Sequence, residues 1–281
     1  MALIRLPAWS YRQFDADYSL DVPGEGYGGW QRVEIEIDPA RTALVVMHAW
    51  DCGTRTEFPG WYRCVEYIPR ANAIAGTVLP PLLAAARRSP ITLLHVVEQG
   101  TPARDYPGYR RAVALAGAQA RAEAAPASES AVPDPSWERL RNFRSDNVFV
   151  GAHNRADVAA GFARLDIHPA ARPVGDEGVA EHAAQLSALC RDAGVNHLVY
   201  AGFAINGCLL TSPGGMVDMS RRGFICSALR QAVTAIENRE SARTEMHKEE
   251  ALWRVALLYG FVFDVDDFAA AIGNGGSRAT G

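Results

Sequence analysis

Residues 198–216 read LVYAGFAINGCLLTSPGGM, and the pattern of this stretch changes at one cysteine, Cys208. An apolar run gives way to small residues before Cys208, and apolar residues then return with helical spacing. A second stretch, TALVVMHAWDCG at residues 42–53, is another apolar run that ends abruptly in polar and reactive residues, starting at His48. Short apolar runs bounded in this way are typical of buried strands. The two stretches therefore predict two strand ends that carry reactive side chains.

The rest of the chain alternates between strand-like and helical patterns. Further short apolar runs lie at residues 91–97, 147–151, 223–229 and 261–265, and helical spacing lies at residues 65–90, 109–125, 178–194 and 242–260. Strands that are apolar throughout bury both of their faces, as strands of a parallel sheet do between two layers of helices. We therefore predict an α/β fold, a three-layer sandwich whose central, mainly parallel sheet has about six strands, with helices on both faces.

The first 40 residues differ from the rest in composition. They are rich in aromatic residues, glycine and acid, and VPGEGYGGW at residues 22–30 has the composition of a loop. We expect an N-terminal extension over residues 1–40, wrapped on a single domain over residues 41–281. The aromatic side chains would expose a large apolar surface if they stayed in solvent. The extension is therefore expected to pack on its own domain or on a neighbouring copy, which predicts a homo-oligomer.

Composition and charge exclude several classes of partner. The net charge is −4 and no run of Lys or Arg forms a basic stripe, so we expect no nucleic-acid partner. The N-terminus lacks the apolar core of a signal peptide, and no stretch approaches the roughly 20 apolar residues of a membrane span. We therefore expect no membrane association and a cytoplasmic location. The five cysteines are odd in number and contain no CxxC pair, which favours reduced thiols over disulfides or a zinc site.

The predicted strand ends are candidates for a site because ligands of open α/β sheets collect at the carboxyl ends of the strands. A thiol close to the N-terminus of a helix is favoured as thiolate, which makes Cys208 a candidate nucleophile, although a free cysteine is often only a small buried apolar residue. His48 is either an acid–base group or a strand-end histidine with a structural role. Glu98 directly follows the run at 91–97 and is either an acid–base group or a solvated carboxylate. Trp50 is either a core aromatic residue or a wall of the substrate pocket.

The segment AGFAINGCLL resembles the GVATDxCV motif of the isochorismatase-like cysteine hydrolases, with Gly202, Ala204 and Cys208 in register. DPARTALVVMHAWD, at residues 38–51, resembles the opening strand of that family. The resemblance covers roughly residues 38–270 and is weakest at residues 100–175. It implies a hydrolase fold in which Cys208 is the nucleophile.

Two positions depart from the family pattern. His48 stands where the family has its catalytic aspartate, and no lysine stands in the middle of the chain, where WERLRNFRSDNVF offers Arg139, Arg141 and Arg144 instead. Histidine can accept the thiol proton, whereas arginine supplies charge but exchanges no proton. The candidate substrate pocket takes in Trp50, Glu98, Phe203, Asn206, Arg141 and Arg144.

The resemblance also implies a backbone arrangement. The Phe203–Ala204 peptide bond would be cis, and the N–H groups of Ala204 and Cys208 would form the oxyanion hole. The metal-binding pattern of the nicotinamidase branch finds no match after His48, so no metal and no cofactor are expected.

These observations lead to two hypotheses about function. In the first, the protein is a cysteine-dependent hydrolase of a small amide or a related C–N bond: Cys208 forms an acyl-enzyme and His48 shuttles the proton. In the second, it is a catalytically silent isochorismatase-fold protein that serves ligand binding or assembly. The retained cysteine favours the first, and the replaced aspartate and lysine favour the second.

Overall fold

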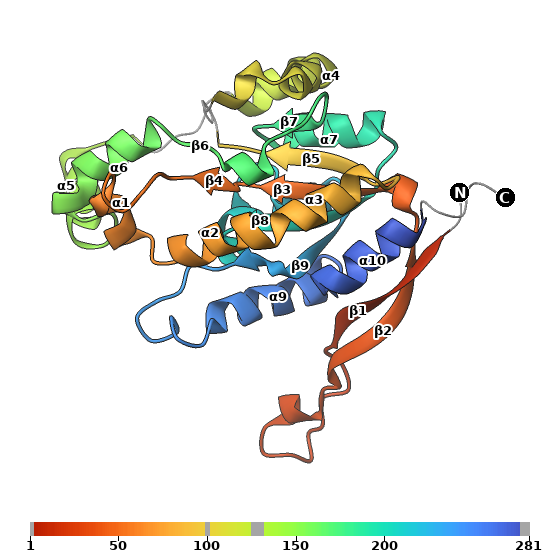
Figure 1. Cartoon of the computed structure of the whole chain (residues 1–281). Coiled ribbons are helices and arrows are strands. Elements are labelled where there is room, and N and C mark those ends of the chain that lie inside the picture. The colour runs from red at the N-terminus through yellow and green to blue at the C-terminus, as the bar shows by residue number, and fades with distance from the viewer. Residues whose placement is uncertain (1–2, 99–101, 125–131, 276–281) are drawn as a thin grey trace.

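A computed structural model describes residues 3–98, 102–124 and 132–275. Within these residues lies an eight-stranded sheet in the order β2-β1-β10-β9-β8-β3-β5-β7 (Figure 1). Its strands are β1 (Ile4–Arg12), β2 (Gly29–Ile37), β3 (Thr42–Met47), β5 (Thr92–Val96), β7 (Gly178–Ala180), β8 (His197–Phe203), β9 (Ile225–Thr234) and β10 (Val262–Phe263). A two-stranded sheet joins β4 (Trp50–Asp51) to β6 (Asp166–Ile167).

Each neighbouring pair in the run β10-β9-β8-β3-β5-β7 is parallel, and the sheet has helices on both faces. This confirms the predicted three-layer α/β sandwich with a mainly parallel sheet. The two additional strands come from the N-terminal hairpin, β1 and β2, whose aromatic and glycine-rich sequence carries no clear strand pattern. The hairpin is antiparallel and joins the sheet where β1 pairs with β10.

Each face of the sheet is covered by its own set of helices. Side chains alternate along the central strands, so Leu44 and Val46 of β3 enter one core cluster, and Val45 and Met47 enter the other. The first cluster includes α2 (Ile68–Thr77), α3 (Leu79–Arg87) and α10 (Val265–Gly275). The second includes α4 (Pro107–Ala124), α7 (Ala183–Asp192), α8 (Met216–Arg221) and α9 (Met246–Leu258).

Three further helices lie beyond the carboxyl ends of β3 and β5, at the left of Figure 1. They are α1 (Pro59–Cys64), α5 (Pro135–Asn147) and α6 (Arg155–Phe162). Within the described part of the chain, no helix is both long and apolar enough to cross a membrane.

The sixth parallel strand is not the one that the sequence pattern predicts. Residues 147–151 form no strand, and the strand is instead Gly178–Ala180, which the pattern assigns to the start of a helix at 178–194. Three residues are too few to show a strand pattern. A Cβ at Gly178 would lie 2.7 Å from Leu94 Cδ2 of the adjacent β5, so a larger residue here would require the buried leucine side chains to shift. The helix α7 starts five residues later, at Ala183.

Candidate functional site

Four reactive side chains follow four adjacent strands at one edge of the sheet. In the sheet order β8-β3-β5-β7, the strands are followed by Cys208, His48, Glu98 and Glu181 respectively. The pairing of Met47 with Gly202 places the ends of β3 and β8 side by side. This is the carboxyl edge, where α/β folds bind their ligands. The structure thus places the turn that carries Cys208 beside the end of β3, which His48 follows.

The close approach of β3 and β8 depends on Gly202. Its φ is 124°, in the region that favours glycine, and a Cβ at this position would lie 1.8 Å from the carbonyl oxygen of Met47. No other residue fits between the two strands. Gly202 therefore fixes how near the turn that carries Cys208 lies to His48.

His48 is held by its backbone at the point where the chain leaves the sheet. Its N–H donates to the carbonyl of Val96 at 2.9 Å, and its carbonyl accepts from the N–H of Trp50 at 3.0 Å. The residue has a φ of 51°, which redirects the chain from β3 towards β4. The side chain is only 5% exposed, and its Nδ1 has no hydrogen-bond partner among the described residues.

Burial keeps the imidazole of His48 neutral. Because the charged form loses its hydration in the interior, the pKa of His48 is lowered to about 4. Its Nε2 lies 3.9 Å from a carboxylate oxygen of Glu98, too far for a hydrogen bond but close enough for that charge to act on an imidazolium. At neutral pH His48 is therefore an unprotonated base with a carboxylate beside it.

Glu98 and Glu181 form a carboxyl pair at this edge. Burial raises the pKa of Glu98, and the negative charge of Glu181 raises it further. Glu181 is buried, and its carboxylate accepts hydrogen bonds from Arg104 Nε at 3.1 Å and from the hydroxyl of Tyr109 at 2.9 Å. The sequence interpretation missed Glu181 because its strand has three residues. A polar residue directly after the apolar run GVA is the signal that could have found it.

Cys208 lies on a short π-helical turn rather than on a long helix. The π-helix η6 (Ile205–Leu209) wraps around the carbonyl of Ala204, which accepts from the N–H groups of Gly207 at 3.2 Å and Leu209 at 3.1 Å. The Phe203–Ala204 bond is cis, as the resemblance implies. The next helix, α8, starts only at Met216. A dipole effect on the thiol is therefore limited to this single turn.

A wall of aromatic side chains lies next to this edge. The ring of Trp50 packs against Tyr67 and Trp61, with centroids 6.1 and 6.2 Å away. Burial raises the pKa of Tyr67, and the charge of a Cys208 thiolate raises it further, so the phenol and the thiol are within electrostatic reach. Tyr67 is a buried, neutral residue that precedes α2, and its helical surroundings gave the sequence interpretation no reason to select it.

A small cavity brings three of the predicted residues together. His48, Trp50 and Glu98 line it, with His95 and Asp166 from neighbouring segments. Its volume is about 20 Å³, which is room for a single water molecule.

Phe203 and Asn206 do not belong to this cavity. The side chain of Phe203 is fully buried in the core cluster of α2 and α3. The side-chain amide of Asn206 forms two hydrogen bonds with the backbone of Ile236. It donates to the carbonyl of Ile236 at 2.8 Å and accepts from the N–H of Ile236 at 2.9 Å. Asn206 thereby ties the cysteine turn to the segment that follows β9.

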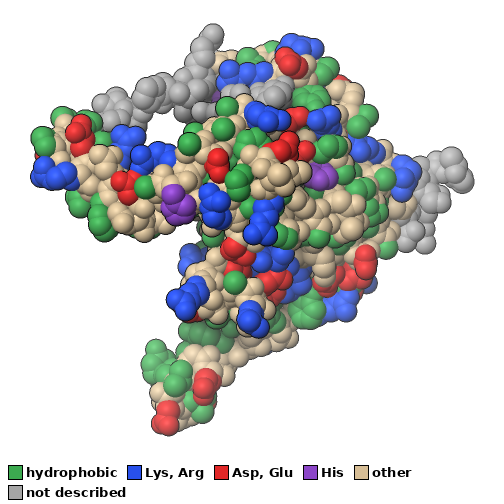
Figure 2. Space-filling model, turned by 60° about the vertical axis from the view of Figure 1, so that its left-hand side comes forward, with side chains coloured by type: hydrophobic (Ala, Val, Ile, Leu, Met, Phe, Trp, Pro, Cys, Tyr) green, Lys and Arg blue, Asp and Glu red, His purple; other side chains and the backbone are tan. Residues whose placement is uncertain are grey.

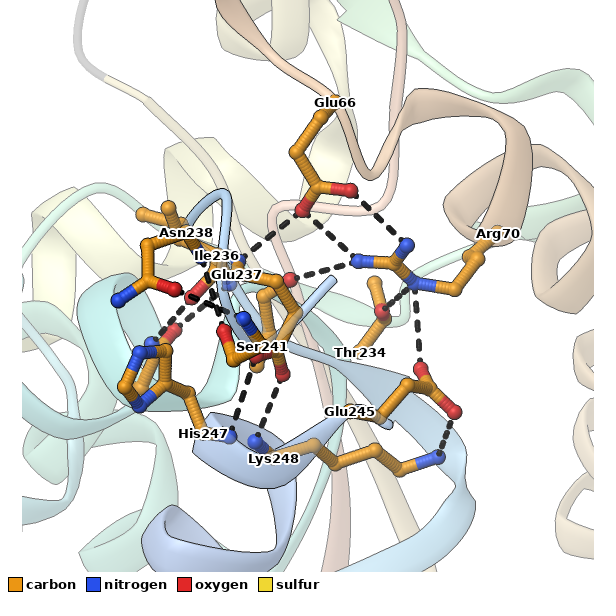
Figure 3. Close-up of polar contacts among 12 residues, drawn as sticks. Glu66, Arg70, Thr234, Ile236, Glu237, Asn238, Ser241, Glu245, His247 and Lys248 are labelled. Carbon is orange, nitrogen blue, oxygen red and sulfur yellow. Dashed lines mark hydrogen bonds and ion pairs between the residues drawn. The ribbon is translucent and has the colours of Figure 1, made fainter. Parts of the chain in front are cut away.

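That segment is itself braced by a polar network (Figure 3). Arg70 donates to both carboxylate oxygens of Glu66 at 2.9 and 2.8 Å, and to the hydroxyl of Thr234 at 3.0 Å. The carboxylate of Glu237 accepts from two backbone N–H groups in the first turn of α9, at 3.1 and 3.0 Å. The network joins α2, β9 and α9. It is connected to the turn that carries Cys208 through the hydrogen bonds between Ile236 and Asn206.

Arg141 and Arg144 are not brought to the His48 cavity. Both are exposed on α5, where they line a separate groove with Trp137, Leu140 and Phe143. Arg139 is exposed on the same helix. The sequence interpretation chose these arginines only because the middle of the chain holds no lysine.

In the described residues, no group of three or more His, Cys, Asp or Glu side chains is arranged to hold a metal ion. The five cysteines are free thiols, of which Cys64 and Cys208 are partly exposed.

No protein-family model and no curated protein matches the chain, but solved structures similar to it exist. One is a cysteine hydrolase from Pseudomonas syringae pv. phaseolicola 1448A, with 14% identity, 85% of this chain and 95% of that chain covered, and a TM-score of 0.47. Another is an isochorismatase family protein from Burkholderia thailandensis, with 16% identity, coverage of 84% and 97%, and a TM-score of 0.46. N-carbamoylsarcosine amidase from Thermoplasma acidophilum shows 16% identity, coverage of 80% and 97%, and a TM-score of 0.41.

Proposed function

We propose that the protein is a cysteine-dependent hydrolase of a small amide or a related C–N bond. The observation that carries the proposal is the adjacency of β3 and β8, which puts a partly exposed thiol and a buried, neutral imidazole at neighbouring strand ends. Cys208 attacks the carbonyl carbon and its proton passes to His48. His48 then gives the proton to the leaving amine, and water releases the acid from the acyl-enzyme.

The carboxylate of Glu98 assists the proton transfer. A pKa of about 4 makes the resting His48 a weak base, so the imidazolium formed during attack needs stabilisation. Glu98 lies 3.9 Å from its Nε2 and supplies the opposite charge. The N–H groups of Ala204 and Cys208 serve as the oxyanion hole, which stabilises the negative charge that develops on the carbonyl oxygen. Trp50 forms an apolar wall for the substrate.

The protein is proposed to work as a homo-oligomer in the cytoplasm, without metal or cofactor. Five free thiols agree with a reducing compartment. Residues 1–40 then act as an extension of the hydrolase domain at residues 41–281, because their hairpin adds strands to the edge of its sheet.

The test is intact-mass measurement after exposure to a panel of small amides and to their activated esters, which acylate faster. We expect one acyl adduct per chain, located on Cys208, and its loss in Cys208→Ala. Cys64→Ser is the matched control, since Cys64 is also partly exposed but lies on α1 and not after one of the four strands, and its thiol donates to the carbonyl of Val150. It should retain the adduct.

His48→Ala should slow formation of the adduct by a factor of about 100, the contribution of a positioned base. If no amide or ester acylates Cys208 faster than Cys64, the hydrolase proposal fails. The silent-fold hypothesis, in which the edge of the sheet only binds a ligand or supports assembly, would then replace it.

A further inference from the structure

The helix α5 (Pro135–Asn147) has no buried residue along its 13 positions. Its start is well specified, because the carboxylate of Asp134 accepts from the N–H groups of Ser136 and Trp137, both at 2.8 Å. A helix of this length is marginal in water unless an apolar face packs on something. Within the described part of the chain, no segment covers the apolar face of α5.

The uncovered face is apolar and basic. Trp137, Leu140 and Phe143 recur every three residues and are 37%, 70% and 63% exposed. With Arg141 and Arg144 they line a groove of about 640 Å³, which we call the α5 groove. Among the described residues, neither arginine forms an ion pair; Arg141 only stacks on Trp137, with its guanidinium 5.3 Å from the ring centroid. The groove thus offers apolar side chains beside unpaired positive charge.

The same chain carries a surface of the opposite charge. The tip of the N-terminal hairpin, residues 13–28, contains no Lys or Arg and four carboxylates, Asp15, Asp17, Asp21 and Glu25. We call it the arm tip. Its apolar side chains are also exposed, at 54% for Phe14, 87% for Tyr18, 40% for Leu20 and 57% for Val22. Figure 2 shows the arm as a projection at the bottom of the molecule that carries hydrophobic and acidic side chains.

The arm tip lies away from the α5 groove of its own copy. Nine paired positions join β1 to β2, and β1 is fixed to the sheet through Trp9 and Val262. In Figure 1 the arm projects from the bottom of the molecule, whereas α5 lies at its left-hand end. Contact between the two surfaces therefore has to be made between copies.

We propose that the arm tip of one copy docks into the α5 groove of a second copy of this chain. The apolar side chains of the arm tip cover those of α5, while Asp21 and Glu25 pair with Arg141 and Arg144. Asp15 is already paired with Arg12 at 3.1 Å within the arm. The two surfaces are opposite in charge and both expose apolar side chains, a combination that favours a specific interface. Each copy has one arm and one groove, so an assembly is closed when every arm occupies the groove of another copy, as in a reciprocal pair or a ring.

Light scattering coupled to size exclusion tests this at about 10 µM protein, because assembly depends on concentration. The wild type should have at least twice the chain mass of 30.4 kDa. The double reversal Arg141→Glu with Arg144→Glu should reduce the mass to that of one chain, and so should Asp21→Arg with Glu25→Arg. Combining all four substitutions restores opposite charges and should restore the assembly.

The matched control is Arg221→Glu with Arg239→Glu, which reverses two exposed arginines outside α5 and should leave the mass unchanged. Circular dichroism of each variant shows whether the fold is intact, so a loss of mass through unfolding is recognised. A wild type with the mass of one chain, an assembly that survives both reversals, or four combined substitutions that restore nothing would each overturn the proposal. None of these results depends on the chemistry of Cys208.

Discussion

At the residue scale, the main question is how a histidine with a lowered pKa can serve as a base. The side chain of His48 is buried for a structural reason. Backbone hydrogen bonds to Val96 and from Trp50 fix the residue at the point where the chain leaves β3. Burial then lowers its pKa to about 4. A weak base at rest becomes useful only if its charged form is stabilised during the reaction, and Glu98 is the group placed to do so.

The role of Glu98 is tested by Glu98→Gln, which keeps the shape and removes the charge. Glu98 is 40% exposed, so solvent screens its interaction with His48 and the loss is modest: we expect acylation of Cys208 to slow about fivefold. Asp166→Asn is the control, because Asp166 lines the same cavity but its carboxylate pairs with Arg172 at 2.7 Å. Rates of acylation followed by mass spectrometry check both. Equal rates in wild type and Glu98→Gln would remove Glu98 from the mechanism.

The reactive residues that the sequence identified are those that end long apolar runs. His48, Glu98 and Cys208 each follow a strand with at least four buried residues, so the strand end is visible as a change of pattern. Glu181 follows only three, and Tyr67 precedes a helix that reaches the site through packing alone. The arginines of α5 show that residue type alone does not locate a site. Their charge made them candidates, but it does not indicate where in the fold their helix lies.

At the element scale, the site depends on how closely β8 approaches β3. Five of the six parallel strands could be predicted, because their side chains are buried on both faces. The sixth, β7, is also buried, but its three residues are too few to show a pattern. The exact contact between two strands cannot be inferred from apolar runs, since it depends on one backbone position. Gly202 supplies that position.

Gly202→Ala should be strongly destabilising. A Cβ 1.8 Å from the carbonyl oxygen of Met47 cannot be accommodated without moving one strand, so we expect a loss of more than about 3 kcal/mol in the free energy of unfolding, or no folding at all. Gly76→Ala is the matched control: Gly76 is an exposed residue of α2 with no atom within 4 Å of its added Cβ. It should be neutral or stabilising by up to about 1 kcal/mol. Urea unfolding measures both, and a Gly202→Ala protein as stable as Gly76→Ala would contradict this account of the strand contact.

At the scale of the whole molecule, buried titratable groups lie at both edges of the sheet. His48 follows β3 at the carboxyl edge, and His197 begins β8 at the opposite end, where its Nε2 lies 2.9 Å from the hydroxyl of Ser227. Burial lowers the pKa of each histidine to about 4. Burial opposes ionisation of Glu177, but hydrogen bonds from His95 and Arg87 outweigh it and lower the pKa of Glu177 to about 2. These shifts couple the stability of the fold to pH.

The two histidines should destabilise the fold as the pH falls from about 6.5 to about 4, because in this window the unfolded chain binds protons that the folded chain does not. Each contributes up to about 1.4 kcal/mol per pH unit, whereas Glu177 acts in a lower window, from about 4.5 to about 2. Urea unfolding at about pH 7.5 and about pH 5 should therefore give a clearly lower free energy of unfolding at the acidic pH. His197→Asn should reduce that difference, and His153→Asn, a change at an exposed histidine, should not. Equal stability of the wild type at the two pH values would show that the buried histidines are hydrated or charged in the folded protein, and His48 would then be a stronger resting base than its burial implies.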